Sequence, residues 1–145
     1  MGLFDSFKAK TAPVFDEQKA IMTIVVAALL ADGEADDDEV ARLRSMCARS
    51  PIFSSNSREQ DDLLIDFAIK MIKQHQNEAV IKAGSALKPL LRETAFAFAV
   101  EIVLADGVVG NQEEVFISKL ASDLGVEEGL AGAIVAVTEI RGRSI

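Results

Sequence analysis

The feature that most constrains the fold of this 145-residue chain is a short acidic segment that occurs twice. Leu-Ala-Asp-Gly occupies positions 30–33 and again 104–107, and in both copies a Glu follows six residues after the Gly. Asp32 and Asp106 are separated by 74 residues, and so are Glu39 and Glu113. An apolar run precedes each copy, and apolar residues at helical spacing follow it. A repeat of this length predicts two copies of a helix–turn–helix unit, not a solenoid of short repeats.

The residues of each copy also predict how the turn is built. The Gly after each Asp is suited to the left-handed position that ends a helix. Asp36 is suited to cap the next helix, with Glu39 completing a capping box three residues later. In the second copy Gly110 takes the cap position and Glu113 the reciprocal one.

Asp32 and Asp106 are not explained by this turn chemistry. If each lies in the last turn of a helix, it opposes the helix dipole at a cost of roughly 0.3–1 kcal/mol. Because the same residue occurs in both copies, we expect a local compensation, either a hydrogen bond from turn amides or a bound cation.

Carboxylates are concentrated in the first copy, where positions 32–39 contain six Asp and Glu residues. Oxygen ligands of this kind suit calcium or magnesium. The spacing differs from the EF-hand calcium loop, because Gly33 follows directly after Asp32. Two interpretations remain open: the carboxylates cap a helix and are otherwise solvated, or they bind a divalent cation. The candidate metal ligands are Asp32, Glu39, Asp106 and Glu113.

The rest of the chain has the pattern of an all-α protein, since no segment alternates like a strand. The expected class is a bundle of about seven helices with an internal pseudo-two-fold duplication. One domain is expected over 1–145, with an N-terminal extension at 1–12 and a basic tail at 141–145. The expected helices span about 13–32, 37–49, 57–75, 78–87, 89–106, 111–124 and 127–140.

Composition excludes several classes of function. The formal net charge is −8 and no basic stripe is present, which disfavours nucleic-acid binding and favours cations or basic partners. The lone cysteine and the absence of a secretory pattern at the start predict a cytoplasmic protein. The longest apolar run, 21–31, is too short to cross a bilayer.

Other candidates for chemistry have simpler explanations. Cys47 falls on an apolar helix face and is expected to be a buried, inert thiol. His75 has no partner residue for a catalytic or zinc arrangement and is expected at a helix C-terminus. Glu101 is expected to face solvent or, if buried, to serve as an extra ligand or pair with Arg92 or Lys119. No catalytic residue is predicted.

The doubled Leu-Ala-Asp-Gly motif, with Glu six residues after each Gly, resembles the signature of TerB-like tellurite-resistance proteins. The resemblance extends from about 19 to 140 and includes Leu124-Gly125. It implies an all-helical bundle in the cytoplasm or at the inner face of the membrane. It also implies a non-enzymatic role in stress-response complexes, with Asp32, Glu39, Asp106 and Glu113 in the positions proposed to bind metal. Val108, Val109 and Gly110 replace acidic-turn residues of the first copy, so the two halves are not expected to bind equally.

The expected function is therefore that of an accessory protein in bacterial tellurite or stress resistance, which binds a divalent cation, a protein partner, or both. The partner can belong to a membrane-associated resistance complex. Two alternatives are an acidic scaffold that docks a basic partner without metal, and a carboxylate-dependent metallohydrolase.

Overall fold

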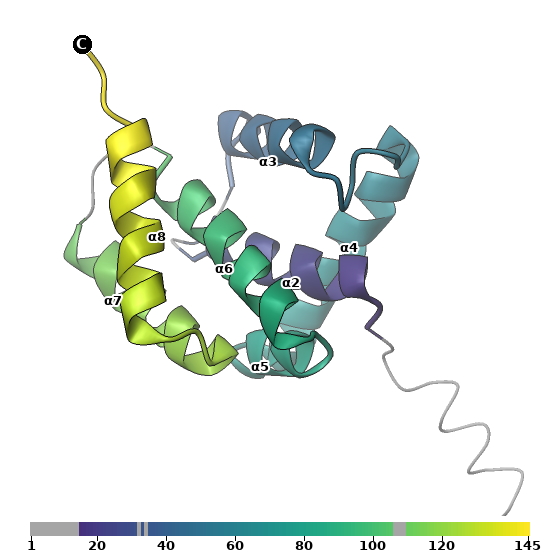
Figure 1. The fold of residues 1–145 in the computed structure, drawn as a ribbon. Helices are drawn as coiled ribbons and strands as arrows, with labels where there is room; N and C mark the ends of the chain where they lie inside the picture. The colour runs from purple at the N-terminus through teal and green to yellow at the C-terminus, as the bar shows by residue number, and fades with distance from the viewer. Residues whose placement is uncertain (1–14, 32, 34, 106–109) are drawn as a thin grey trace, which may run out of the picture.

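The computed structural model describes residues 15–31, 33, 35–105 and 110–145, and within them the chain forms seven α-helices and no strand (Figure 1). This confirms the all-α class. The helices are α2 (Glu17–Leu29), α3 (Asp37–Arg49), α4 (Arg58–His75), α5 (Glu78–Ser85), α6 (Pro89–Val103), α7 (Asn111–Leu124) and α8 (Glu128–Arg141).

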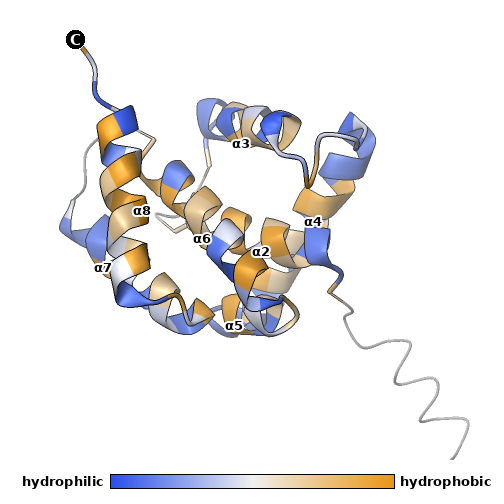
Figure 2. Ribbon diagram, viewed as in Figure 1, coloured by the Kyte–Doolittle hydropathy of each residue, from blue (hydrophilic) through white to orange (hydrophobic). Residues whose placement is uncertain are grey.

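Helix α2 is the centre of the bundle because it is apolar on almost every side. Nine of its 13 residues are buried, and it packs against α4, α5 and α6. The buried polar residue Thr23 is satisfied within the helix, since its hydroxyl donates to the Lys19 carbonyl at 2.8 Å. Figure 2 shows α2 and α6 as predominantly hydrophobic ribbons in the interior of the molecule.

Local capping chemistry sets most helix boundaries where the sequence predicts them. Asp36 accepts a 2.8 Å hydrogen bond from the Glu39 amide at the start of α3. Ser57 and Gln60 form the complete capping box of α4. Gly125 adopts the left-handed conformation, with φ 67°, at the end of α7. Gly33 also has a positive φ, 120°, which favours glycine at this turn.

Four predicted helix boundaries were wrong by two residues or more. Helix α2 starts at Glu17, where Asp16 caps it, and ends at Leu29, three residues before position 32. Helix α6 ends at Val103 and α5 at Ser85. Asp32 and Asp106 lie outside the described residues, so the helix-dipole penalty expected there and its compensation stay predictions.

The two predicted units agree in their local structure. The last residues of α2 and α6 are 74 positions apart in the sequence, and the first residues of α3 and α7 are also 74 positions apart. The end caps Leu30 and Leu104 have nearly equal φ and ψ, −92° and 5° against −96° and 16°. Their packing differs, because α3 packs chiefly on α6 while α7 packs on α5 and α6. Superposition of 21–46 on 95–120 about a pseudo-two-fold axis stays a prediction.

Candidate functional site

The two acidic segments meet at one cavity. Its volume is about 310 Å³, and its walls come from the C-terminal ends of α2 and α6 and the N-terminal ends of α3 and α7. We call it the turn cavity. Its lining residues are Ala28, Leu29, Ala31, Asp36, Asp38, Glu39, Arg42, Ile102, Val103, Ala105, Gln112, Glu113 and Phe116.

Glu39 and Glu113, which are 74 residues apart and occupy equivalent places in the two segments, both line the turn cavity. Asp36 and Asp38 line it from the same end of α3, and Arg42 supplies a positive charge one turn further along the helix. The arrangement follows from capping, since carboxylates in the first turn of a helix complement its positive dipole end. Two helix N-termini that face one cavity therefore bring their acidic side chains to it.

The Glu113 carboxylate folds back over the start of its own helix. A Cβ atom added at Gly110 would lie 2.5 Å from Glu113 Oε2, closer than such atoms approach one another. Glycine at this cap position therefore leaves space for the Glu113 side chain, whereas the first copy has Asp36 at the equivalent position. The two halves of the cavity are chemically unequal for this reason.

Two of the four predicted metal ligands, Asp32 and Asp106, lie outside the described residues, as does Glu34 of the first acidic turn. Within residues 15–31, 33, 35–105 and 110–145, no group of three or more Asp, Glu, His or Cys side chains is arranged to hold an ion. The structure brings Glu39 and Glu113 to one cavity, and a metal site built from all four residues stays a prediction.

Cys47 is buried against the core at 2% exposure, as expected. Burial, reinforced by the negative charge of Asp61, raises the pKa of the Cys47 thiol to about 11. The thiolate is the reactive form of cysteine, so this residue is a poor nucleophile at neutral pH. His75 is the last residue of α4, as predicted.

Glu101 pairs with a residue that the sequence did not suggest. Its Oε1 lies 3.7 Å from Nη2 of Arg49 on α3. Both predicted partners are engaged elsewhere: Arg92 Nε donates to the Gly84 and Leu87 carbonyls, and Lys119 pairs with Asp123 at 2.7 Å. The Glu101 side chain is 40% exposed, which agrees with the expected solvent-facing position. The partners expected for a buried Glu101 came only from α6 and α7, whereas in the fold α3 packs against α6 and supplies Arg49.

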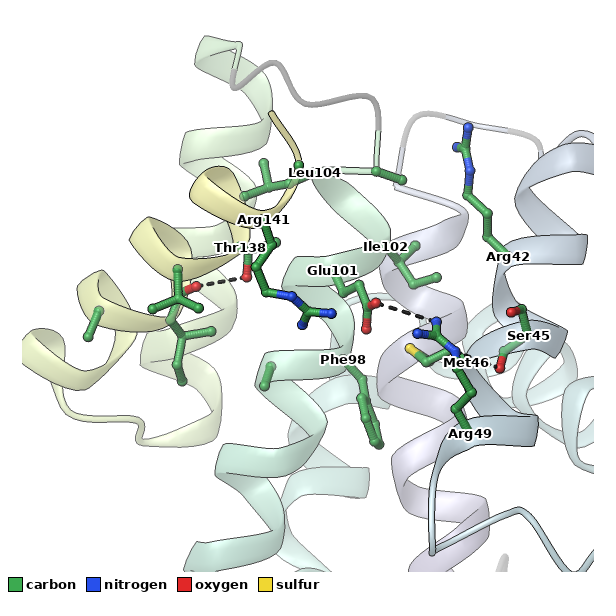
Figure 3. A pocket seen from close by; sticks show the side chains of 16 residues that line it. Arg42, Ser45, Met46, Arg49, Phe98, Glu101, Ile102, Leu104, Thr138 and Arg141 are labelled. Atoms are coloured by element: carbon green, nitrogen blue, oxygen red, sulfur yellow. Dashed lines mark hydrogen bonds and ion pairs between the residues drawn. The ribbon is translucent and has the colours of Figure 1, made fainter. Parts of the chain in front are cut away.

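A second and larger pocket lies beside the turn cavity, between α3, α6 and α8. Its volume is about 660 Å³, and Arg42 lines both cavities. Figure 3 shows Arg49 and Glu101 facing each other across it, with Phe98 and Ile102 on the α6 side. This pocket was not predicted from the sequence. Its one signal was the seven-residue spacing of Arg42 and Arg49, which places both on the same face of α3.

A comparison with protein-family models matches residues 18–134 to the family described as tellurite resistance protein TerB. The chain belongs to the TerB family. Searches of curated proteins and of solved structures found no match. The matched range includes both acidic segments and ends within α8, so the turn cavity is built entirely from the TerB region. Family membership associates this chain with tellurite resistance.

In the part of the chain that the structure describes, none of the helices has the length and apolar character needed to span a membrane.

Proposed function

We propose that this TerB-family chain is a non-enzymatic accessory protein of bacterial tellurite or stress resistance, and that the turn cavity binds a divalent cation, calcium or magnesium. Glu39 and Glu113 supply carboxylate oxygens from the two α-helix N-termini. Asp32 and Asp106 complete the ligand set from the segments between the helices. Metal binding in the turn cavity links the two acidic segments and so stabilises the surface that a protein partner contacts.

The observation that carries the proposal is the presence of Glu39 and Glu113 at a single cavity. They come from segments 74 residues apart, and their carboxylate oxygens have the chemistry that hard cations prefer. A cation between them also offsets the mutual repulsion of like charges.

The test is ion-dependent thermal stability after removal of bound metal with a chelator. Calcium, magnesium, manganese and zinc are compared on wild type, Asp32→Asn/Asp106→Asn and Glu39→Gln/Glu113→Gln. At 100 times its dissociation constant a cation stabilises the native state by about 2.7 kcal/mol. For a domain of this size, this corresponds to several degrees in Tm. We expect both double variants to lose this shift.

A matched control is Glu59→Gln/Glu128→Gln, which removes two first-turn carboxylates from α4 and α8 outside the turn cavity. This variant should respond to the cation like wild type. An equal response in all four proteins, or none in any, refutes the metal site.

A second candidate is an acidic scaffold without metal. It is favoured by the exposed carboxylates of Asp36, Asp37 and Asp38, which lie at the start of α3 beside the cavity. Binding of a basic partner to such a surface weakens steeply as ionic strength rises, whereas chelation depends on the identity of the ion.

A further inference from the structure

Helix α8 is apolar, yet the bundle buries little of it. Within this fully described helix, Ala131 alone is buried. Val137 and Ile140 are each 55% exposed. An amphipathic helix normally places its apolar stripe against a core. The apolar surface of α8 that borders the α3–α6–α8 pocket is therefore left without a covering element among the described residues.

The pocket combines this apolar surface with positive charge. Ile134 and Val137 line it from α8, and Phe98 and Ile102 line it from α6. In the described part of the chain, its charged lining residues are Arg42, Arg49, Arg141 and Glu101. A net positive lining is unusual in a protein with a formal net charge of −8. The pocket therefore selects for a ligand that is both apolar and acidic.

The arginines are distributed along the pocket, not gathered at one point. Arg42 and Arg49 lie seven residues apart on α3, so their backbones are separated by about 10.5 Å along the helix axis. Arg141 extends from the end of α8 on the opposite wall (Figure 3). A single carboxylate or phosphate head group is too small to engage all three. Several carboxylates spaced along a helix match them.

Glu101 occupies the place of one such carboxylate. It approaches Arg49 at 3.7 Å, and its side chain is 40% exposed while that of Arg49 is 62% exposed. A pair with this separation and exposure is weak. An incoming carboxylate that forms a two-point hydrogen bond with the Arg49 guanidinium can therefore displace Glu101.

We propose that the α3–α6–α8 pocket is a docking groove for an acidic amphipathic helix of a partner protein. The apolar face of that helix covers Val137, Ile134 and Phe98, and its flanking carboxylates pair with the arginines of α3 and α8. This is the helix-in-groove mode of recognition, in which apolar anchors give affinity and flanking charges set orientation. The groove borders the turn cavity and shares Arg42, Ile102 and Ala105 with it, but docking in the groove does not require metal binding in the turn cavity.

The test measures fluorescence anisotropy of a labelled synthetic helix of about 18 residues, which is about 27 Å long. It carries Leu along one face and Glu on both flanks. One control peptide replaces each Glu with Lys, and another has the same composition in scrambled order. We expect the Glu helix to bind and both controls to bind at least about tenfold more weakly.

Variants then locate the binding surface. Val137→Asp should weaken binding by about tenfold or more. Its matched control is Val115→Asp, because Val115 is an exposed apolar residue of α7 outside the groove, at 69% exposure. Arg49→Glu should weaken binding similarly, with Arg58→Glu on α4 as its control. Arg49 is preferred to Arg42 because Arg42 also lines the turn cavity.

Glu101→Gln tests the proposal by an expected gain in affinity, where the other variants are expected to lose affinity. Because it removes the internal competitor for Arg49, it should tighten binding of the Glu helix. Equal affinity for the Glu, Lys and scrambled peptides, or equal loss in Val137→Asp and Val115→Asp, overturns the proposal.

Two other occupants give distinct results. Binding to phosphatidylglycerol vesicles that Val137→Asp abolishes, without binding of the peptide, assigns the groove to a membrane surface and overturns the proposal. Concentration-dependent self-association that Val137→Asp abolishes, measured by sedimentation, assigns it to a second copy of this chain and overturns it equally.

Discussion

At the scale of single residues, a side-chain cap marks the start of α2, α3, α4 and α8. Glu127 is the clearest case, because its carboxylate accepts hydrogen bonds of 2.9 Å from both the Gly129 and the Leu130 amides. These two bonds lower the pKa of Glu127 from its ordinary value of 4.5. The charged form is therefore favoured in the folded state.

This predicts how pH affects the start of α8. A group whose pKa is lowered by folding contributes stability above its unfolded pKa and loses that contribution as pH falls through its folded value. Glu127→Ala should lower Tm at pH 7, and the difference from wild type should shrink as pH falls below about 4.5. Thermal unfolding followed by circular dichroism between pH 3 and 7 measures both effects.

The control is Glu128→Ala, which removes the adjacent first-turn carboxylate but leaves the Glu127 cap in place. A Tm loss that is equal in the two variants, or that does not change with pH, contradicts a specific role for the Glu127 cap.

At the scale of helices, close packing depends on glycine where two helices approach each other. Gly84 of α5 faces the buried Leu124 of α7, and a Cβ atom added at Gly84 would lie 2.8 Å from Leu124 Cδ2. Gly132 of α8 provides the contrast, because an added Cβ there would have no neighbour within 4 Å. Both glycines lie within helices, so replacing either one by alanine gains the same intrinsic helix preference.

Gly84→Ala and Gly132→Ala should therefore change stability in opposite directions. Alanine favours a helix over glycine by about 0.8–1.0 kcal/mol, which should stabilise the Gly132 variant. At Gly84 the overpacking penalty of roughly 1–3 kcal/mol opposes this gain, so the free energy of unfolding should fall by up to about 2 kcal/mol. Urea unfolding measures both, and a stabilised Gly84→Ala would mean that Leu124 moves aside at no cost.

At the scale of the whole molecule, stability is distributed unevenly around α2. Helix α2 is enclosed by α4, α5 and α6, whereas α3 lies at the edge of the bundle, packs against α6 and buries only Leu43, Met46 and Cys47 (Figure 1). Because few contacts hold α3, it can open without unfolding the core.

Native-state hydrogen exchange should reveal this difference. The amides of α2 should exchange only through global unfolding, and those of α3 should exchange at least about 100-fold faster through local opening. The core variant Ile24→Ala, which should cost roughly 2–5 kcal/mol, should speed exchange in α2 much more than in α3. Equal protection of the two helices would show that α3 is part of the central cooperative unit.

The sequence determined the helices of this protein because capping and apolar periodicity act within a few residues of the chain. Asp36, Ser57, Pro89 and Gly125 mark boundaries that the structure retains. The predicted C-terminal ends of α2 and α6 are three residues too late, because the helices end at Leu29 and Val103 and two turn residues follow each of them. The doubled motif was also sufficient to indicate the TerB family, which the family comparison confirmed.

Tertiary structure alone decided which side chains share a surface. The sequence singled out Glu39 and Glu113, but their presence at one cavity depends on how the ends of four helices meet. The pairing of Glu101 with Arg49 depends in the same way on α3 packing against α6, and the exposed apolar face of α8 depends on which helices pack against α8. Helix crossings are set by packing between residues far apart in the chain, and periodicity within one helix does not encode which partner covers each face.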